Sequence, residues 1–285
     1  MTLASMNISY IRKIVTLALA EDIGRGDVTT RALVPADRKT AAHIVFRSPG
    51  VVCGLAVAAQ AFKCLDPGVR FKALVRDGVF LSKPAPVARL EGPARAILTA
   101  ERVALNFLGR LSGIASQTKR FVEKVKPYKA VIMDTRKTTP LLRAFERYAV
   151  CCGGGANHRF DLSRMAMIKD NHRVFLAGRM GIKAMVSAAR KKSRTVEVEV
   201  DNLAQLREAL VSSAEVILLD NMTVSQTRRA VRLRDQTNSR VLLEASGGIT
   251  LTNVRGYAAA GVERISVGAL THSPKSINVS LEFIS

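Results

Sequence analysis

Short apolar, β-branched runs alternate with amphipathic helical stretches through the second half of the chain, and this rhythm constrains the fold most. The runs are Ala130–Met133, Met165–Ile168, Thr195–Val200, Val216–Leu219, Val241–Leu243 and Arg264–Val267. Helical patterns lie between most of them, at Phe175–Lys192, Leu203–Ser212, Ser225–Arg234 and Leu251–Ala260. Repeated strand–helix units of this size predict parallel strands with right-handed crossovers. Six units indicate a barrel or a partly closed one, rather than the eight-unit barrel.

The first third of the chain has a different pattern. Helical periodicity covers residues near 8–21 and begins again near Ala94. Between these stretches, strand-like alternation occurs at His43–Arg47, Phe71–Val75 and Val87–Leu90. This mixture predicts a small α+β domain that ends near residue 110.

The charge of the chain limits the kinds of partner it can attract. Lys and Arg number 44 against 23 Asp and Glu, a net charge of +21. Such a charge attracts anions, whether nucleic acid, an acidic membrane or a small polyanionic substrate. There is no basic tail and no basic block with interleaved aromatics, so no specific nucleic-acid partner is expected. The longest apolar run, Val51–Phe62, is shorter than the ~20 residues that span a bilayer, so no membrane partner is expected.

The cysteines indicate the compartment. Cys53, Cys64, Cys151 and Cys152 have neither the spacing of a zinc site nor that of a disulfide framework. We therefore expect reduced thiols in a cytoplasmic protein. Charged residues interrupt the N-terminal segment, which favours an amphipathic helix over a signal peptide there.

Polar and charged residues follow each apolar run. They are Asp134–Lys137, Lys169 and Asp170, Glu197 and Glu199, Asp220 and Asn221, Glu244–Gly248, and Gly268 with Thr271 and His272. Because the carboxyl ends of parallel strands form one face where catalytic residues gather, these segments predict a site with both signs of charge. In the alternative interpretation, Asp220 and Ser246 cap the helices that follow them.

Five of these and neighbouring residues form a cationic set: Arg136, Lys137, His158, Arg159 and Lys169. Guanidinium groups bind carboxylate or phosphate through two prongs, and lysine acts as a point charge. The set therefore suits a substrate with several anionic groups. The alternative is ordinary ion pairing with Asp134, Glu146 or Asp170.

Two carboxylates, Glu199 and Asp220, end successive predicted strands. Mg²⁺ in proteins is usually held by one or two carboxylates together with substrate phosphates and water, so this pair suits a magnesium–pyrophosphate complex. Glu197 lies two residues before Glu199 and shares its face of the strand. Spacing alone does not tell which of the two binds metal.

Two glycine-rich segments indicate backbone binding of a ligand. Three consecutive glycines lie within Cys152–Arg159, where backbone N–H groups can approach a ligand closely. Ser246, Gly247 and Gly248 follow a strand and open a helix, and Gly268 closes the next strand. Backbone amides at such points can bind phosphate.

Nine segments in this order resemble the quinolinate phosphoribosyltransferases, also called carboxylating nicotinate-nucleotide pyrophosphorylases. They are EDIGRGDVTT (21–30), ERVALNFLGRLSGIAS (101–116), DTRKTTP (134–140), CGGGANHR (152–159), MIKDNH (167–172), VEVEV (196–200), LLDNM (218–222), ASGGI (245–249) and SVGALTHS (266–273). The resemblance implies an α/β fold with an N-terminal open-faced α/β sandwich at residues 1–110, joined by a C-terminal tail at 274–285. It implies a six-stranded incomplete α/β barrel at 111–273, and a homodimer whose active site is completed by the partner subunit.

The resemblance also implies the reaction. The phosphoribosyl group of phosphoribosyl pyrophosphate would pass to the nitrogen of quinolinate with decarboxylation, giving nicotinate mononucleotide, pyrophosphate and CO2 in NAD biosynthesis with Mg²⁺. Arg102 would reach the partner's quinolinate, and the quinolinate pocket would contain Arg136, His158, Arg159 and Lys169. Phosphoribosyl pyrophosphate and its magnesium would be served by Lys137, Lys169, Glu199 and Asp220. The 5-phosphate would be held by Ser246, Gly247, Gly248, Gly268 and His272.

The chain departs from the family pattern at a few positions, including Leu141 (usually Gly), Phe145, Cys151 and Arg164. None of them removes a proposed catalytic group. The alternatives are a paralogue of the same fold, acting on nicotinate or associated with molybdenum transport, and a basic nucleic-acid-binding protein. A dicarboxylate acceptor matches the cationic set best, because a monocarboxylate leaves one buried cation unpaired.

Overall fold

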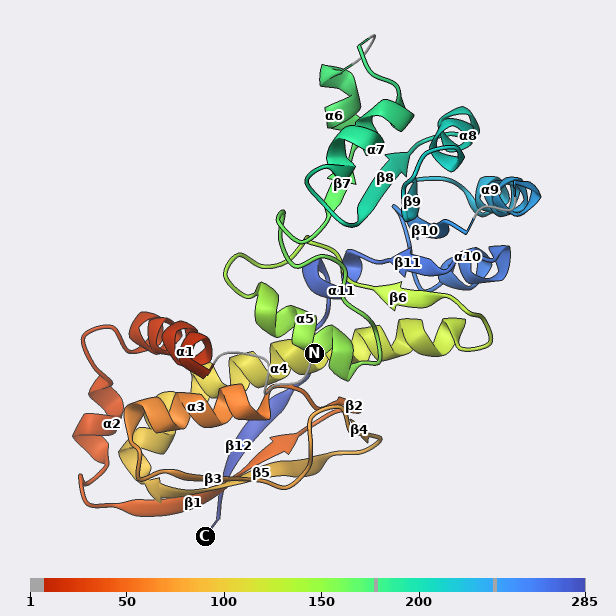
Figure 1. Cartoon of the computed structure of the whole chain (residues 1–285). Coiled ribbons are helices and arrows are strands. Elements are labelled where there is room, and N and C mark those ends of the chain that lie inside the picture. The colour runs from red at the N-terminus through yellow and green to blue at the C-terminus, as the bar shows by residue number, and fades with distance from the viewer. Residues whose placement is uncertain (1–7, 177–178, 238–239, 285) are drawn as a thin grey trace. The chain divides into compact units, whose positions relative to one another are not determined.

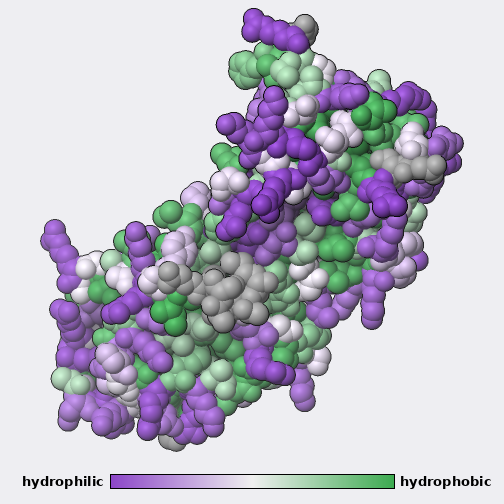
Figure 2. All heavy atoms as spheres, viewed as in Figure 1, coloured by the Kyte–Doolittle hydropathy of each residue, from purple (hydrophilic) through white to green (hydrophobic). Residues whose placement is uncertain are grey.

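The structure is a computed structural model that describes residues 8–176, 179–237 and 240–284, arranged in two compact units (Figure 1). The first unit contains the described residues up to Lys119, residues 138–154 and the segment from Ser273 onward. The second contains residues 120–137 and 155–272. In the described part of the chain, no helix is both long and apolar enough to cross a membrane. Hydrophilic side chains are spread over the visible face of both units rather than gathered in one patch (Figure 2).

A four-stranded antiparallel sheet forms the base of the first unit. Its strand order is β12 (Val279–Ile284), β1 (Lys39–Phe46), β5 (Ala85–Pro93) and β3 (Arg70–Ala73). The last strand of the chain thus pairs with the first, and Leu281 lies opposite Ile44. A separate two-stranded ribbon joins β2 (Gly50–Val51) to β4 (Phe80–Leu81).

Helices cover one side of this sheet. The helices of this part of the chain are α1 (Ile8–Ile23), α2 (Val28–Leu33), α3 (Leu55–Leu65) and α4 (Ala94–Val125). Figure 1 shows α1, α3 and α4 on the same side of the sheet, so the predicted open-faced sandwich is confirmed. Ile97, Leu108 and Leu111 of α4 are buried in the core, and each contributes about 1.5–3 kcal/mol relative to an exposed side chain.

The short helix α5 (Arg143–Cys152) also belongs to the first unit. The turn just before it contains one departure from the family pattern. Leu141, where the family usually has Gly, has a φ of 63°, a left-handed conformation that favours glycine. Its exposed side chain avoids a clash, and its carbonyl accepts a 2.6 Å hydrogen bond from the Tyr10 hydroxyl. Tyr10 in turn stacks on the buried Phe145, with ring centroids 5.9 Å apart.

The second unit is built on six parallel strands. They are β6 (Val131–Met133), β7 (Ala166–Ile168), β8 (Val196–Val200), β9 (Val216–Asp220), β10 (Leu242–Ser246) and β11 (Arg264–Ser266). Their order is β6-β11-β10-β9-β8-β7, so consecutive strands from β7 onward are neighbours and β6 closes the row next to β11. In the described residues the two edge strands β6 and β7 do not pair, and the predicted incomplete six-stranded barrel is confirmed.

The helices of this unit are α6 (Asp170–Phe175), α7 (Ile182–Arg190), α8 (Leu203–Leu210), α9 (Val224–Gln236), α10 (Val254–Ala260) and α11 (Ala269–His272). The predicted helix 175–192 is wrong at its start, because α7 begins only after Gly181, and residues 177–178 lie outside the described part. The capping alternative is also wrong. Thr223 caps α9 by accepting the Gln226 N–H, and Asn253 precedes α10, so neither Asp220 nor Ser246 is a cap.

Candidate active site

A pocket of about 670 Å³ opens at the carboxyl ends of the parallel strands, entirely within the second unit. All six strands contribute to its wall at or just after their carboxyl ends, as parallel α/β folds require of their active sites. The wall is formed by Thr135, Arg136, Lys137, His158, Arg159, Met167, Lys169, Glu199, Leu218, Asp220, Asn221, Glu244, Ser246, Gly247, Gly248, Ile249, Thr250, Ser266, Gly268, Ala269 and His272.

The structure brings nearly all of the predicted site residues to this one pocket. Those that line it are Arg136, Lys137, His158, Arg159, Lys169, Glu199, Asp220, Ser246, Gly247, Gly248, Gly268 and His272. Arg102 does not line it and lies exposed on α4, in the part of that helix that belongs to the first unit.

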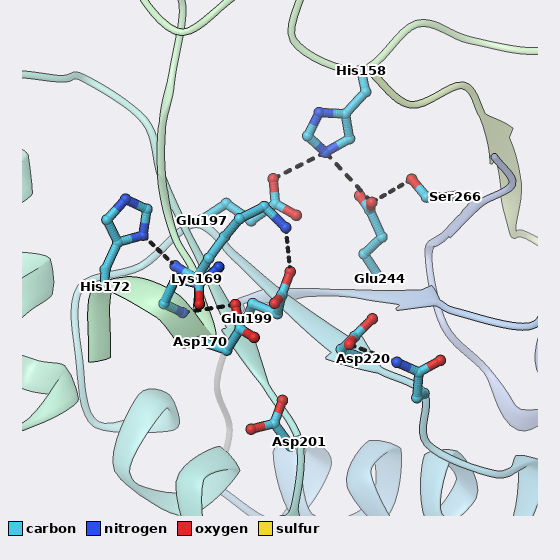
Figure 3. A network of polar contacts seen from close by, with 12 residues as sticks. His158, Lys169, Asp170, His172, Glu197, Glu199, Asp201, Asp220, Glu244 and Ser266 are labelled. Atoms are coloured by element: carbon cyan, nitrogen blue, oxygen red, sulfur yellow. Dashed lines mark hydrogen bonds and ion pairs between the residues drawn. The ribbon is translucent and has the colours of Figure 1, made fainter. Parts of the chain in front are cut away.

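Strand β8 presents two carboxylates on one face. Its sequence alternates Val and Glu, and all five residues are buried, which places Glu197 and Glu199 together on the inner face. Lys169 follows the neighbouring strand β7, and its Nζ lies 2.6 Å from Oε2 of Glu199 (Figure 3). Of the two glutamates, Glu199 lines the pocket and Glu197 does not.

Asp220 ends the next strand, β9, beside the Lys169–Glu199 pair. Burial first, and then the negative charge of Glu199, raise the pKa of Asp220. Asn221 donates from Nδ2 to Oδ2 of Asp220 at 2.7 Å, and adopts a φ of 52° that asparagine tolerates. Two neighbouring carboxylates that repel each other in the pocket wall are a suitable ligand set for a hard divalent cation.

A buried aspartate positions the loop that carries His158. Asp134 ends strand β6 and is fully buried. It accepts the backbone N–H of His158 at 2.7 Å and the side-chain amide of Asn157, also at 2.7 Å. The Gly-rich segment predicted as a binding loop is thereby attached to β6, and Ala156 bridges Met133 of that strand.

The ring of His158 faces two fully buried carboxylates (Figure 3). Its Nε2 lies 3.0 Å from Oε2 of Glu197 and 3.4 Å from Oε1 of Glu244, as ion-pair contacts without the alignment of good hydrogen bonds. Burial alone would lower the pKa of His158, but Glu197 and Glu244 outweigh it and raise this pKa to about 10. Nδ1 accepts the N–H of Arg159 at 2.8 Å, which opposes a second proton on the ring. The carboxylates thus favour a proton on Nε2 and a charged ring, and the Arg159 N–H at Nδ1 is the one contact that competes with the second proton.

The sequence interpretation placed Glu244 among the strand-end residues but gave it no role in the site. It lies two residues before Ser246 in β10, so both side chains point to the same face of that strand. The Ser266 hydroxyl donates to its Oε1. A carboxylate inside an otherwise apolar strand was the available signal, because such a group is rarely buried without a partner.

Two guanidinium groups complete the cationic wall. Arg159 donates from Nη1 to the carbonyl of Met165 at 3.0 Å, which orients its side chain. Burial, and then the positive charge of Arg136, lower the pKa of Arg159. The two arginines are thus close enough to repel each other, and an anion bound between them would relieve this repulsion.

Backbone geometry shapes the opposite wall. Gly247 has a φ of 90°, and a Cβ there would collide with the side chain of Asn221 and lie 2.9 Å from its backbone nitrogen. A Cβ at Gly268 would come within 3.2 Å of Cδ of Lys137. The Thr271 hydroxyl donates to the carbonyl of Lys137 at 2.7 Å and fixes the backbone of that residue. The approach at Gly247 requires glycine, whereas a Cβ at Gly268 would need the Lys137 side chain to shift slightly.

Comparison with known proteins identifies the family. The model of the quinolinate phosphoribosyl transferase C-terminal domain matches residues 114–282, and that of the N-terminal domain matches residues 27–112. The chain belongs to the quinolinate phosphoribosyltransferase family. The sequence resemblance is therefore confirmed across both parts of the chain.

Individual relatives agree with this assignment. A nicotinate-nucleotide pyrophosphorylase (carboxylating) of Mycobacterium leprae is 43% identical over 277 residues, which cover 95% of this chain and 96% of the relative. A probable enzyme of the same name from Bacillus subtilis is 40% identical over 280 residues, covering 97% and 94%. The solved structure of the nicotinate-nucleotide pyrophosphorylase of Francisella tularensis superposes with a TM-score of 0.91 at 36% identity, covering 100% of this chain and 99% of the other.

Proposed function

We propose that this chain transfers the phosphoribosyl group of phosphoribosyl pyrophosphate to the ring nitrogen of quinolinate with loss of one carboxylate. The products are nicotinate mononucleotide, pyrophosphate and CO2, and the reaction belongs to NAD biosynthesis. The observation that carries the proposal is the single pocket that joins Arg136, His158 and Arg159 to the carboxylate pair Glu199 and Asp220. The first group suits a dicarboxylate, and the second suits a metal-bound pyrophosphate.

Quinolinate would bind at the cationic wall. Arg136 and Arg159 can each grip a carboxylate with two prongs, which fixes the plane of the pyridine ring. His158 would present its ring close to the same carboxylates, held by Asp134 from behind. A second carboxylate on the substrate is favoured because the repulsion between the two guanidinium groups is then compensated.

Phosphoribosyl pyrophosphate would bind along the lysines and the glycine turns. Lys137 and Lys169 are point charges suited to pyrophosphate oxygens, and the amides near Gly247, Gly248 and Gly268 suit the 5-phosphate. Ser246 and His272 would add side-chain hydrogen bonds at this end. Lys169 directly follows β7. It would serve both substrates, because it lies between the cationic wall and the wall that carries the carboxylate pair.

The site fits Mg²⁺, which Glu199 and Asp220 would hold. The fit rests on the donor set, two neighbouring carboxylates; burial, and then the charge of Glu199, raise the pKa of Asp220. When bound, the ion would neutralise charge on the pyrophosphate. Lys169 already compensates one of these carboxylates, so the chain itself limits how much negative charge faces the substrate.

The reaction follows from the charges of these groups. Positive charge grows on the ribose ring as pyrophosphate leaves, and Lys137 and Lys169 stabilise the leaving group. The pyridine nitrogen, held in plane by the arginines, attacks the ribose carbon. The carboxylate beside the nitrogen is then lost as CO2, and the electron pair it leaves on the ring carbon is stabilised by the adjacent positive nitrogen. That carbon takes up a proton from solvent to give nicotinate mononucleotide. No covalent enzyme intermediate is required.

We also propose that the active protein is a cytoplasmic homodimer. Arg102, exposed on α4, would contribute to the quinolinate site of the partner subunit. The domain division would be residues 1–110 with 274–285, and residues 111–273.

The test is a product assay. Purified protein is incubated with quinolinate, phosphoribosyl pyrophosphate and Mg²⁺, and nicotinate mononucleotide is sought by mass, with nicotinate in a parallel tube. Product from quinolinate alone supports the proposal. Product from nicotinate alone would contradict it.

A further inference from the structure

A second cluster of ligand-type side chains lies within the first unit, which contributes nothing to the pocket described above. Cys53 follows β2, Asp77 lies in the turn before β4, and Cys152 ends α5. The two sulfur atoms and a carboxylate oxygen of Asp77 all lie within 4.8 Å of one another. Three segments far apart in the sequence therefore bring two thiols and a carboxylate to one point.

Backbone contacts fix these groups in place. The Ser112 hydroxyl accepts the N–H of Cys53 at 2.9 Å and donates to its carbonyl at 3.1 Å. Asp77 accepts the N–H groups of Gly54 and Leu55 at 3.0 and 3.2 Å. The Tyr148 hydroxyl, one turn before Cys152 on α5, donates to Asp77 at 2.9 Å. A carboxylate has about four lone-pair sites, so Asp77 keeps one acceptor position after these three bonds.

The chemistry of the three atoms favours a thiophilic cation over a hard one. Thiolate sulfur selects Zn²⁺ and related ions, whereas Mg²⁺ prefers oxygen ligands. Asp77 and Cys152 are partly exposed, which leaves a path from solvent, whereas Cys53 is fully buried. The cysteines are free thiols.

The two thiols differ in how readily they ionise. A hydrogen bond from Cys53 lowers the pKa of Cys152. Burial raises the pKa of Cys53, which keeps that thiol neutral until a ligand replaces its proton. Cys152 is also the more exposed of the two thiols, so it would be the first contact of an incoming cation, and the fully buried Cys53 the second.

We propose that Cys53, Asp77 and Cys152 form a binding site for one thiophilic divalent cation of the Zn²⁺ class. Tetrahedral Zn²⁺ with bonds of about 2.3 Å to sulfur separates two sulfur atoms by about 3.8 Å, so small side-chain movements suffice to close the site. Each thiol releases its proton to solvent as the sulfur–metal bond forms. A water molecule supplies the fourth ligand. The site ties α5 to the turn before β4 and to the start of α3, and it is independent of the proposed reaction.

Cobalt binding tests the site directly. The full chain is reduced, freed of metal and titrated with Co²⁺ without oxygen, and the thiolate-to-cobalt charge-transfer absorption is recorded. We expect saturation at one Co²⁺ per chain and loss of the absorption when Zn²⁺ is added. Cys53→Ser and Cys152→Ser should lower the affinity by more than about 100-fold, beyond the usual effect of losing an outer-shell partner. Cys64→Ser and Cys151→Ser, the matched controls, should retain it. Co²⁺ at Glu199 and Asp220 has oxygen ligands and gives no such absorption.

A measurement on the unaltered chain covers the case in which the buried Cys53→Ser variant fails to fold. Alkylation by iodoacetamide is followed at each cysteine by mass, with and without Zn²⁺. Zn²⁺ should slow the alkylation of Cys152 by at least about tenfold and leave Cys64 unchanged. Equal alkylation of Cys152 in both samples, or no thiolate absorption with Co²⁺, would overturn the proposal. So would a Cys53–Cys152 disulfide that forms in air while the reduced pair has no affinity for metal.

Discussion

The ammonium group of Lys169 lies 2.6 Å from the carboxylate of Glu199, and the two side chains come from the neighbouring parallel strands β7 and β8. The side chain of Glu199 is only 7% exposed, whereas that of Lys169 is 40% exposed. The carboxylate is thus fixed by burial, and the lysine is held over the pocket by the carboxylate. Asp220 from β9 lies next to this pair, so one contact couples the cationic and anionic parts of the site.

Replacement of the lysine tests this coupling. Lys169→Met should lower turnover by about 100-fold or more, the usual effect of removing one preorganised charge from a site. The thermal unfolding midpoint should change little, because the side chain is partly exposed. Steady-state kinetics and a thermal melt measure both quantities. The control is Lys192→Met, which removes an exposed lysine of the same unit and should leave turnover as it is. Unchanged turnover in Lys169→Met would contradict the assignment.

Asp220 tests the proposed magnesium site. Asp220→Asn should raise the Mg²⁺ concentration at half-maximal activity by about 10–100-fold or more, because a charged ligand is lost. Without Mg²⁺ the variant should unfold at a higher temperature than the wild type at neutral pH, since the repulsion from Glu199 that raises the pKa of Asp220 is removed.

The matched control for this experiment is Asp201→Asn. Asp201 follows β8, is half exposed and pairs with Arg173 at 2.6 Å. It should leave the Mg²⁺ requirement unchanged. If both variants need the same Mg²⁺ concentration as the wild type, Asp220 is not a ligand.

The raised pKa of His158 predicts the direction in which the stability of the fold changes with pH. A folded-state pKa of about 10 lies above the ordinary value of 6.5, so the folded chain binds this proton more tightly than the unfolded chain. The resulting stability is fully present below pH 6.5 and is lost as the pH rises through about 10. Urea unfolding of the wild type and of His158→Asn should therefore show a difference that narrows over this range. A constant difference would mean that the Arg159 N–H on Nδ1 keeps the ring neutral throughout.

Two glycines in the turn after β10 differ in what a side chain would meet. Gly247 has both a positive φ and a close neighbour, whereas Gly248 has only a positive φ. Gly247→Ala should cost about 1–3 kcal/mol of stability and raise KM for phosphoribosyl pyrophosphate, because its Cβ meets Asn221 and its φ is 90°. Gly248→Ala should cost only about 1–2 kcal/mol, since φ is 59° but nothing lies within 4 Å of the added Cβ. Chemical denaturation ranks the two. A larger loss in Gly248→Ala would contradict the geometry.

Mixing two inactive variants tests whether sites are shared between subunits. Arg102→Ala and Lys137→Ala should each be inactive alone. An equimolar mixture should recover about a quarter of the wild-type activity, because about half of its dimers are mixed and one of the two sites in each mixed dimer has both residues intact. Activity is measured after subunit exchange, with mass analysis to show that mixed dimers form. Mixed dimers without any recovery would argue against a shared site.

Sequence reasoning located most of the pocket because strand-end positions follow from the alternation itself. In β8 the Val–Glu alternation by itself predicts that Glu197 and Glu199 lie on one face of the strand. The glycines near Gly247 were found because a turn after a strand has few alternatives. Both inferences depend on neighbours within about five residues along the chain.

The His158 cluster could not be found in this way. Glu197 belongs to β8 and Glu244 to β10, and β9 lies between these strands. Both carboxylates reach the same imidazole only because the sheet curves, which local patterns do not reveal. Helix α3 was missed for a simpler reason. Leu55, Ala58 and Phe62 have helical spacing, but the sequence interpretation weighed the apolar run around them only as a membrane span.

The most direct test of the account follows one carbon atom. Quinolinate labelled in the carboxylate beside the ring nitrogen is supplied with phosphoribosyl pyrophosphate and Mg²⁺, and labelled CO2, pyrophosphate and nicotinate mononucleotide are measured together. The account predicts equal amounts of all three, and no labelled CO2 when phosphoribosyl pyrophosphate is omitted. Product that retains the label, or CO2 released without phosphoribosyl pyrophosphate, would contradict it.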